Sequence, residues 1–302
     1  MWERLVECVP NVSEGRRQDV IDEIADAIRG VQGVILLDVD SDEAHNRSVF
    51  TMVSEPEGLE RAVLAFFRAA VSRIDLRGHQ GEHPRMGAVD VVPVVPVRGV
   101  SMADCVELSG RLGQAIWKRF EVPVYLYEES AAEPGRRNLA NIRRGQFEGF
   151  PEKIQQEAWG PDFGERRVHP SAGVCAVGAR EFLIAFNVNL GTSELETAQE
   201  IARAVRGSSG GFHYVKALGV ELAERGIVQV TMNLTNYKKS PIPRVLECIR
   251  LEAARRGVPV VGSEIVGMVP QAALDAVVEY YTSLEDFRGE MVLDRRVQQL
   301  TS

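Results

Sequence analysis

Apolar and polar positions recur along the chain in two similar successions of strands and helices. In the first succession, Val20, Ile21, Ile24 and Ile28 have helical spacing, which predicts a helix over residues 17–28. A second helix is expected over 56–74, because Pro56 is favourable in a first turn. Apolar runs predict strands over 5–9, 34–39, 47–53 and 88–97, and the run 34–39 is expected to be buried.

The chain continues beyond this first succession with less regular patterns. A helix is predicted over 101–120 and a strand over 124–127. Residues 130–170 are rich in glycine and proline, which indicates irregular structure with short helices, and a strand over 172–177 follows. Strands are then predicted over 182–190, 215–222, 227–234 and 258–261, and helices over 193–205, 243–256 and 271–284. Thr192 or Ser193 is expected to cap the first of these helices.

Both successions have the order β-α-β-β-α-β, which is typical of ferredoxin-like folds. The predicted fold class is therefore α+β, with two similar βαββαβ subdomains over residues 1–178 and 179–302. The helices of each subdomain are expected to cover one face of its sheet. We expect the opposite faces to face each other across a ligand groove, which is a natural place for a small molecule.

Composition excludes several classes of protein. Of 302 residues, 45% are apolar and 26% charged, so a mostly disordered chain is excluded. A net charge of −8 argues against a nucleic-acid partner. The sequence contains neither an apolar run of membrane-spanning length nor an N-terminal signal peptide, so we expect no membrane span and a cytoplasmic location. The four cysteines are widely scattered and are expected to be buried and reduced.

Most of the polar chemistry is concentrated in the segment 77–87, between a predicted helix and a predicted strand. It contains two imidazoles, the carboxylate of Glu82 and two guanidinium groups, and its glycines permit close approach of a ligand. His83 can exchange a proton near neutral pH. The alternative is a loop histidine satisfied by backbone groups. His79 and His83 have metal-pair spacing, but the surrounding Gly and Pro residues make a helix unlikely there, so no metal site is expected.

Two further polar segments are candidates for binding. Strand alternation places Asp38 and Asp40 on one face of the predicted sheet. Arg47 could reach the same ligand groove as His83 and donate two hydrogen bonds to a substrate carboxylate. The alternative is a solvated turn. Basic residues also pair at Arg136–Arg137, Arg143–Arg144 and Arg166–Arg167. The default interpretation of these pairs is solvated surface. The alternative is a binding site for an anionic tail of a ligand. Dinucleotide, P-loop, HExxH and serine-elbow motifs are absent from the sequence.

The sequence strongly resembles the formiminotransferase domain of formiminotransferase-cyclodeaminase, which also occurs as a stand-alone glutamate formimidoyltransferase. The most specific segment is Gly81-Glu-His-Pro-Arg-Met-Gly-Ala88. The other matching segments follow in order along nearly the whole chain: 5–15, 36–40, 46–47, 122–127, 159–164, 185–190 and 259–263.

The resemblance implies a transferase that moves the formimino group of N-formimino-L-glutamate to N5 of tetrahydrofolate in histidine degradation, giving 5-formiminotetrahydrofolate and L-glutamate. It implies that His83 is the catalytic residue and exchanges protons with both reactants. Substrate-binding residues are expected to be Asp40, Arg47, Glu82 and Arg85, of which Asp40 is the first candidate to stabilise a cationic amidine. Folate-binding residues are expected to be Gly164, Glu165, Arg166, Arg167, Val168, His169, Pro170, Ser171, Ala172 and Gly173.

The resemblance also implies partners and alternatives. Tetrahydrofolate, with or without a polyglutamate tail, is the expected co-substrate, and no metal is required. A separate cyclodeaminase is expected to take the next step, and a homodimer is the commonest assembly. The first alternative is ATP-dependent 5-formyltetrahydrofolate cyclo-ligase activity. The second is a non-catalytic folate-binding protein, against which the Gly-Glu-His-Pro-Arg cluster argues, because a carrier needs no proton shuttle.

Overall fold

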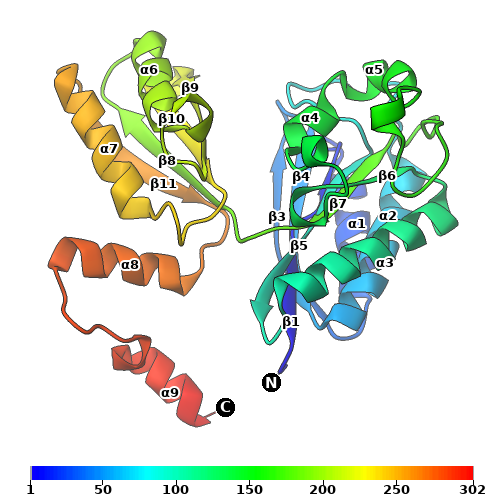
Figure 1. Ribbon diagram of the computed structural model, residues 1–302, viewed down its shortest axis with the longest axis horizontal. Coiled ribbons are helices and arrows are strands. Elements are labelled where there is room, and N and C mark those ends of the chain that lie inside the picture. The colour runs from blue at the N-terminus through cyan, green and yellow to red at the C-terminus, as the bar shows by residue number, and fades with distance from the viewer. Residues whose placement is uncertain (1, 302) are drawn as a thin grey trace. The chain divides into compact units, whose positions relative to one another are not determined.

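The computed structural model describes residues 2–301, which form two compact units, Met1–Arg180 and Glu181–Ser302 (Figure 1). We call them unit 1 and unit 2. Each unit has its own sheet and its own hydrophobic core. The expected α+β class with two similar subdomains is confirmed, because both units contain the order β-α-β-β-α-β. The groove expected between the sheets stays a prediction.

The sheet of unit 1 is built around a strand that Pro10 interrupts. β1 (Leu5–Cys8) and β2 (Asn11–Val12) both lie between β4 (Arg47–Ser54) and β5 (Val89–Arg98), and all these pairings are antiparallel. Beyond β4 lies β3 (Val34–Asp42). Beyond β5 lie β7 (Cys175–Ala179) and then β6 (Val124–Leu126), both parallel to their neighbours.

Three long helices cover one face of this sheet: α1 (Gln18–Arg29), α2 (Pro56–Arg73) and α3 (Met102–Phe120). Alternate strand residues such as Val6, Phe50 and Met52 point into the core beneath these helices. Three of the four cysteines are fully buried, as expected, whereas Cys248 of unit 2 is only half-buried. The hydrophobic periodicity predicted the ends of these helices within two residues, because their apolar stripes follow the helical repeat.

The strand β3 corrects one expectation. The apolar run 34–39 predicted a buried strand, but β3 pairs only with β4 and lies at the edge of the sheet. Ile35 and Leu37 are 49% and 45% exposed, because they point to the face that the helices leave uncovered. The register also shifts between Leu36 and Asp38, which places Val39 toward the core.

The uncovered face of β5, β6 and β7 is closed by the irregular segment that follows β6. Its helices are short, as expected: η1 (Glu128–Ser130), η2 (Pro134–Arg136), α4 (Leu139–Arg143), α5 (Gln146–Lys153) and η3 (Glu157–Trp159). A small core joins this segment to the sheet through Tyr125, Ile142 and Phe150. The segment therefore forms a second layer over half of the sheet.

Two arginines of this segment correct the interpretation of the basic pairs as solvated surface. Arg136 is buried, its Nη1 donates to Asp162 Oδ2 at 3.0 Å, and its Nη2 donates to backbone carbonyls. Arg143 pairs with buried Asp90. Sequence spacing cannot distinguish such arginines from exposed ones, because their carboxylates lie 26 and 53 residues away. Arg137 and Arg144 remain exposed, as the default interpretation predicts.

Unit 2 has a sheet with the order β11-β8-β10-β9, with antiparallel pairing throughout. Its elements are β8 (Ile184–Leu190), α6 (Leu195–Val205), β9 (Val215–Leu222), β10 (Ile227–Leu234), α7 (Ile242–Arg255), β11 (Val260–Val266), α8 (Gln271–Thr282) and α9 (Leu293–Thr301). The helices α6 and α7 cover one face of the sheet (Figure 1). The expected N-cap of α6 is wrong: the cap position is Glu194, without a side-chain cap bond, and Thr192 Oγ1 instead accepts from the Glu194 N–H.

Within residues 2–301, the structure contains no helix long and apolar enough to cross a membrane.

The buried ion pair of Arg136 and Asp162 gives a first prediction. Arg136→Ala should lower the free energy of unfolding by about 3–5 kcal/mol, because it leaves a largely buried carboxylate without its cation. Arg137→Ala removes an exposed guanidinium paired with Glu129 and should cost less than about 1 kcal/mol. Urea denaturation of both variants measures the difference. If both variants lose the same small amount of unfolding free energy, Arg136 is not a buried structural cation.

Candidate active site

The loop that carries His83 is fastened to the turn between β3 and β4. Asn46 is the centre of this contact: its Nδ2 donates to Gln80 O at 2.9 Å, and its Oδ1 accepts from Gly15 N at 2.9 Å. The Glu82 N–H donates to the carbonyl of Ala44 at 3.2 Å. Asn46 has φ 48°, a left-handed conformation that asparagine tolerates better than most residues. Three distant segments therefore meet at one side chain.

Gly81 makes this contact possible. A Cβ at this position would lie 2.3 Å from the carbonyl oxygen of His45, so only glycine lets the two segments approach so closely. Glu82, two residues from the Asn46 contact at Gln80, is exposed. The sequence correctly indicated that glycine permits close approach here, but the partner is the protein backbone.

Arg85 fixes the other end of the loop. Its guanidinium donates to His79 Nδ1 at 3.1 Å, to the carbonyl of His79 at 3.2 Å, and to both carboxylate oxygens of Glu148 at 2.6 and 2.8 Å. It also donates to Gln146 at 3.2 Å. All five N–H groups of Arg85 thus have acceptors within the protein. The residue joins the His83 loop to α5, and its predicted role in substrate binding stays a prediction that these contacts do not favour.

The His83 imidazole lies partly exposed among charged groups. Its ring centroid is 6.4 Å from that of His45, at an interplanar angle of 61°. His83 Nε2 is buried and has no hydrogen-bond partner among the described residues. Burial lowers the pKa of His83 to about 3, and the positive charges of Arg47 and Arg143 contribute to the shift. The ring is therefore neutral at physiological pH.

Arg47 and Arg143 have different surroundings. Arg47 Nε is buried without a partner among the described residues, and burial lowers the pKa of Arg47 to about 10, so the group stays protonated at pH 7. Arg143 instead donates from Nε to Asp90 Oδ2 at 2.7 Å. Asp90 Oδ1 accepts from the Met86 N–H at 2.7 Å, which holds the carboxylate at the end of the His83 loop. Sequence reasoning missed Asp90 and the contribution of Arg143.

The register of β3 and β4 places Asp42 opposite Arg47 and Asp40 near it. Asp38 and Asp40 lie opposite Thr51 and Val49, and Asp42 lies opposite Arg47. Because these positions alternate in step, Asp38 and Asp40 share one face, as the sequence predicts. Asp40 is exposed, and its negative charge raises the pKa of Arg47 against the dominant effect of burial.

The predicted folate segment 164–173 divides into two parts. The first part includes Gly164, whose Cβ would lie 3.0 Å from the Trp117 ring at the end of α3. Arg166 donates to the carbonyls of Gln155 and Gln156 at 2.9 and 3.2 Å, and both Arg166 and Arg167 are exposed. These contacts place the first part beside α3 and η3.

The second part of that segment, residues 168–173, folds back on itself. The N–H and C=O groups of His169 and Gly173 exchange hydrogen bonds, and His169 Nδ1 accepts from Ala172 N at 2.9 Å. Burial lowers the pKa of His169. This turn pairs with the backbone directly after the His83 loop, since Ala88 N donates to the carbonyl of Ala172. Residues 168–173 therefore adjoin the loop that carries His83.

Sequence reasoning also missed Glu7, a buried carboxylic acid on β1. Its strand neighbours Val6 and Cys8 point into the core beneath the helices, so Glu7 points to the opposite face of the sheet. Burial raises the pKa of Glu7 to about 7, and the charge of Arg180 offsets part of this effect. The signal that could have identified Glu7 is the presence of an acidic residue inside an apolar run.

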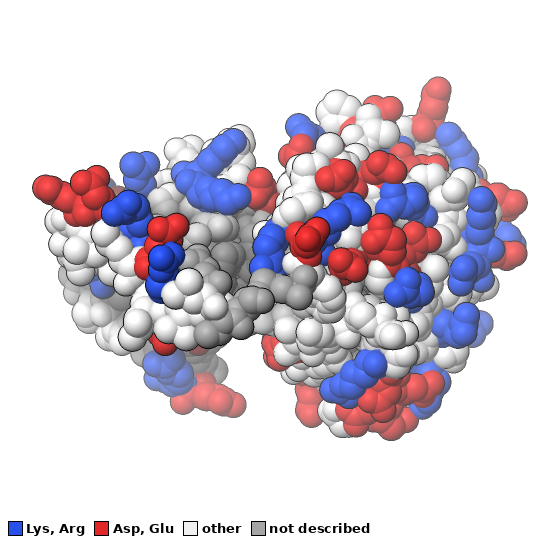
Figure 2. All heavy atoms as spheres, turned by 90° about the horizontal axis from the view of Figure 1, so that it is seen from below, with Lys and Arg blue, Asp and Glu red and all other residues white. Residues whose placement is uncertain are grey.

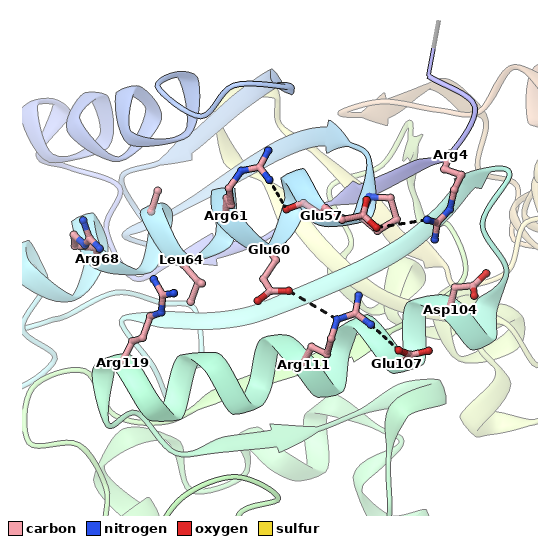
Figure 3. Close-up of a pocket in the computed structure, with 12 residues that line it drawn as sticks. Arg4, Glu57, Glu60, Arg61, Leu64, Arg68, Asp104, Glu107, Arg111 and Arg119 are labelled. Carbon is pink, nitrogen blue, oxygen red and sulfur yellow. Dashed lines mark hydrogen bonds and ion pairs between the residues drawn. The ribbon is translucent and has the colours of Figure 1, made fainter.

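A pocket on the other side of the unit 1 sheet does not contain these groups. It has a volume of about 790 Å³ and is lined mainly by α2 and α3 (Figure 3). Arg111 bonds Glu107 at 2.8 Å inside it, and Arg4 lies 3.5 Å from Glu57. Figure 2 likewise shows acidic and basic side chains intermixed on the face that it draws. Mixed, paired charges are typical of a solvated helical surface.

No cluster of histidine, cysteine, aspartate and glutamate with the geometry to hold a metal ion occurs among the residues the structure describes.

The fold and the site together define a two-unit α+β protein with a neutral histidine among arginines, and comparisons with known proteins identify its family. The descriptions "Formiminotransferase domain, N-terminal subdomain" and "Formiminotransferase domain" match residues 5–180 and 185–297. The chain therefore belongs to the formiminotransferase domain family, as the sequence motifs indicated.

Two relatives of similar length are both named glutamate formimidoyltransferase, and a longer relative matches over about half of its length. A glutamate formimidoyltransferase of Streptococcus pyogenes serotype M1 is 49% identical over 284 residues, which cover 94% of this chain and 95% of that protein. One of Thermoplasma acidophilum is 48% identical over 296 residues, covering 97% of each chain. The formimidoyltransferase-cyclodeaminase of Rattus norvegicus is 44% identical over 305 residues, covering 97% of this chain and 56% of that protein.

The raised pKa of Glu7 predicts how stability changes with pH. Between its ordinary pKa of 4.5 and its folded value of about 7, the folded state binds more protons than the unfolded state. Burying the ionised carboxylate therefore lowers the free energy of unfolding by its full amount above pH 7. This destabilisation disappears as the pH falls toward 4.5. Glu7→Gln should stabilise the protein by about 2–3 kcal/mol at pH 8.5 and by almost nothing at pH 4.5. Urea unfolding at both pH values measures this, and a difference independent of pH would contradict it.

Proposed function

We propose that this protein transfers the formimino group of N-formimino-L-glutamate to N5 of tetrahydrofolate. In the reaction, N5 attacks the amidine carbon of the donor and forms a tetrahedral intermediate. The bond from that carbon to the glutamate nitrogen then breaks. N5 loses one proton and the departing nitrogen gains one, so the products are 5-formiminotetrahydrofolate and L-glutamate.

His83 is the proposed catalytic residue. The observation that carries this assignment is its buried Nε2, which has no hydrogen-bond partner among the described residues. A buried polar atom without a partner is costly, so a bound reactant that completes the hydrogen bond is favoured. A neutral imidazole can accept the proton of N5 and then donate it to the departing nitrogen, a contribution of about 10²–10⁴-fold to the rate.

The low pKa of His83 in the free protein needs an explanation, because so weak a base takes a proton poorly. The charges of Arg47 and Arg143 are part of the cause. Formiminoglutamate brings two carboxylates, and pairing one of them with Arg47 would offset part of this positive charge. The pKa of His83 would then rise when the donor is bound, while the larger effect of burial would remain. Donor binding would thereby activate the base.

Arg47 is the proposed ligand of a donor carboxylate, since its buried Nε has no partner among the described residues. Arg85 is better assigned to positioning the His83 loop, because its donors are already used. Asp40, and secondarily Glu82, would stabilise the positive charge of the amidine in the intermediate. Both carboxylates are exposed in the free protein.

Tetrahydrofolate is the proposed co-substrate, and residues 164–173 are its proposed contacts. The turn 168–173 supports this, because it adjoins the His83 loop. A polyglutamate tail, a homodimer, a cytoplasmic location and a separate cyclodeaminase that consumes the product are further proposals that follow from the resemblance. In the division into residues 1–178 and 179–302, we assign the catalytic histidine to the first part.

Replacing His83 tests the assignment. His83→Ala should lower kcat by about 10²–10⁴-fold, because the proton shuttle is lost. The dissociation constant for 5-formyltetrahydrofolate should change less than about threefold, since its N5 carries no proton for His83 to accept. A coupled spectroscopic assay and calorimetry measure the two quantities, and His45→Ala is the matched control for a nearby imidazole. Near-normal turnover of His83→Ala would reject the assignment.

Assays of the wild type distinguish the alternative functions. Formimino transfer without ATP supports the proposal. Consumption of 5-formyltetrahydrofolate that requires ATP would favour the cyclo-ligase, and folate binding without either turnover would favour a carrier.

Variants of Arg47 and Arg85 should have different effects, because Arg47 is proposed to bind the donor and Arg85 to position the His83 loop. Arg47→Ala should raise the KM for formiminoglutamate by about tenfold or more, because a charge-assisted bond to a carboxylate is lost. Arg85→Ala should mainly lower the free energy of unfolding and kcat, because it releases the His83 loop from α5. Steady-state kinetics and urea denaturation of both variants test this. A KM for formiminoglutamate that responds to Arg85 and not to Arg47 would reverse the two assignments.

A further inference from the structure

Among the residues that the structure describes, four buried side-chain atoms have no hydrogen-bond partner: Asn11 Oδ1, Arg47 Nε, His83 Nε2 and Arg136 Nε. The Arg136 nitrogen belongs to a guanidinium whose other two nitrogens are paired. Arg47 and His83 already have proposed roles in the reaction. Asn11, on β2, is the one of the four that no role explains.

Asn11 points to the sheet face that α1, α2 and α3 leave uncovered. Its neighbour Val12 belongs to the core beneath those helices, and successive side chains of a strand point to opposite faces. Asn11 is 2% exposed, so water has little access to its Oδ1. A buried acceptor without a donor is costly, which favours a ligand that supplies an N–H group.

The strand register places Asn11 in a row with residues of the candidate active site, all within unit 1. Val49 of β4 lies opposite Asn11 on one side and opposite Asp40 of β3 on the other. Arg47 lies two residues before Val49 and points to the same face. It is therefore a diagonal neighbour of Asn11, at about 7–8 Å. The charge of Arg47 acts on His83, so the row adjoins the proposed catalytic residue.

The formimino group of the proposed donor has the chemistry that this row lacks. A protonated amidine is flat, is positively charged and carries N–H groups on both nitrogens. The strands of Asn11 and Asp40 are two spacings apart, about 10 Å, and hydrogen bonds of about 2.9 Å to both nitrogens of an amidine cover a similar distance. The outer nitrogen is the narrow end of the donor, so it is the part that can reach the buried Asn11.

We propose that Asn11 Oδ1 accepts a hydrogen bond from the outer nitrogen of the formimino group and thereby selects formimino donors over formyl donors. The inference rests on the proposed function. N-formyl-L-glutamate has an oxygen in place of this nitrogen, and that oxygen has no hydrogen to donate. Two acceptors would then face each other unpaired, and a buried polar group left unpaired discriminates between similar ligands. Asn11 is thus a specificity-determining residue, and proton transfer stays with His83.

Tetrahydrofolate also carries N–H groups, so it is the competing occupant. The position of Asn11 beside Arg47, the proposed ligand of a donor carboxylate, favours the donor. In formiminoglutamate, the α-carboxylate and the nitrogen that bears the formimino group are attached to the same carbon. Neighbouring side chains on one sheet face can therefore contact both groups at once.

Asn11→Leu removes the acceptor and keeps a side chain of similar size. The dissociation constant for formiminoglutamate, measured by calorimetry, should rise about 10–100-fold, as for the loss of a hydrogen bond to a charged group. The constant for N-formyl-L-glutamate should not rise, and that for 5-formyltetrahydrofolate should change less than about threefold. In steady-state assays, the KM for formiminoglutamate should rise with little change in kcat, because the contact is made before the reaction begins.

Stability separates this role from a structural one. Asn11→Leu removes a buried acceptor that has no partner, so its urea midpoint should equal or exceed that of the wild type. Asn11→Ser keeps an acceptor and should bind formiminoglutamate better than Asn11→Leu, and it serves as the second variant if leucine disturbs the fold. Thr51→Val is the matched control, because Thr51 lies on the other diagonal of Asn11, away from Arg47. Its three dissociation constants should stay within about twofold of the wild type.

Three outcomes would overturn the inference: equal rises for the formimino and formyl donors, a rise confined to 5-formyltetrahydrofolate, or no change in any of the three constants. Selective loss of formiminoglutamate binding, in a protein whose wild type transfers no formimino group, would instead support the contact and contradict the proposed function.

Discussion

Desolvation and the positive charge of Arg47 and Arg143 act together on one imidazole, and the properties of the site depend on this constraint. Alone, burial would make His83 a neutral and weakly basic ring. The two guanidinium groups strengthen that effect in the free protein. Arg47 is also the proposed ligand of a donor carboxylate, so a charge that lowers the pKa of His83 in the free protein would be offset by the reactant that it attracts. The proposal thus couples donor binding to proton transfer through electrostatics.

The environment of His83 is maintained by contacts between segments far apart in the sequence. Asn46 joins the β3–β4 turn to the loop before His83, and Arg85 joins the same loop to α5. The pair of Arg143 and Asp90 then links α4 to the start of β5. The irregular segment after β6 thus has a direct function, because it carries one of the charges that set the pKa of His83. This explains why a long segment with little regular structure is held by its own small core.

The order of elements could be predicted from the sequence because the helices of both units have clear apolar stripes and the strands are short apolar runs. The edge position of β3 could not, because an apolar run such as Leu36-Leu37 has the same composition whether one face or both are buried. The α6 cap was also misjudged, since a threonine near a helix start can bond outside the cap geometry, as Thr192 does.

The candidate site likewise contains residues that the sequence predicts and residues that it does not. His83 and Arg47 are predicted as site residues from the polar density of their segments and from the family resemblance. Arg143 and Asp90 could not be predicted, because their contact spans 53 residues and no local pattern signals it. The internal acceptors of Arg85 could not be predicted either, since an exposed arginine and one saturated by internal acceptors look alike in sequence.

The central claim is that the charges of Arg47 and Arg143 add to the effect of burial in lowering the pKa of His83, and that this pKa rises when a donor carboxylate pairs with Arg47. Nuclear magnetic resonance titration of the His83 ring, with and without saturating L-glutamate as a stand-in for the donor, tests this most directly. We predict a pKa near 3 in the free protein and a rise of at least one unit with glutamate bound. A ring that titrates near 6.5 in the free protein, or whose pKa does not respond to glutamate, would contradict the account.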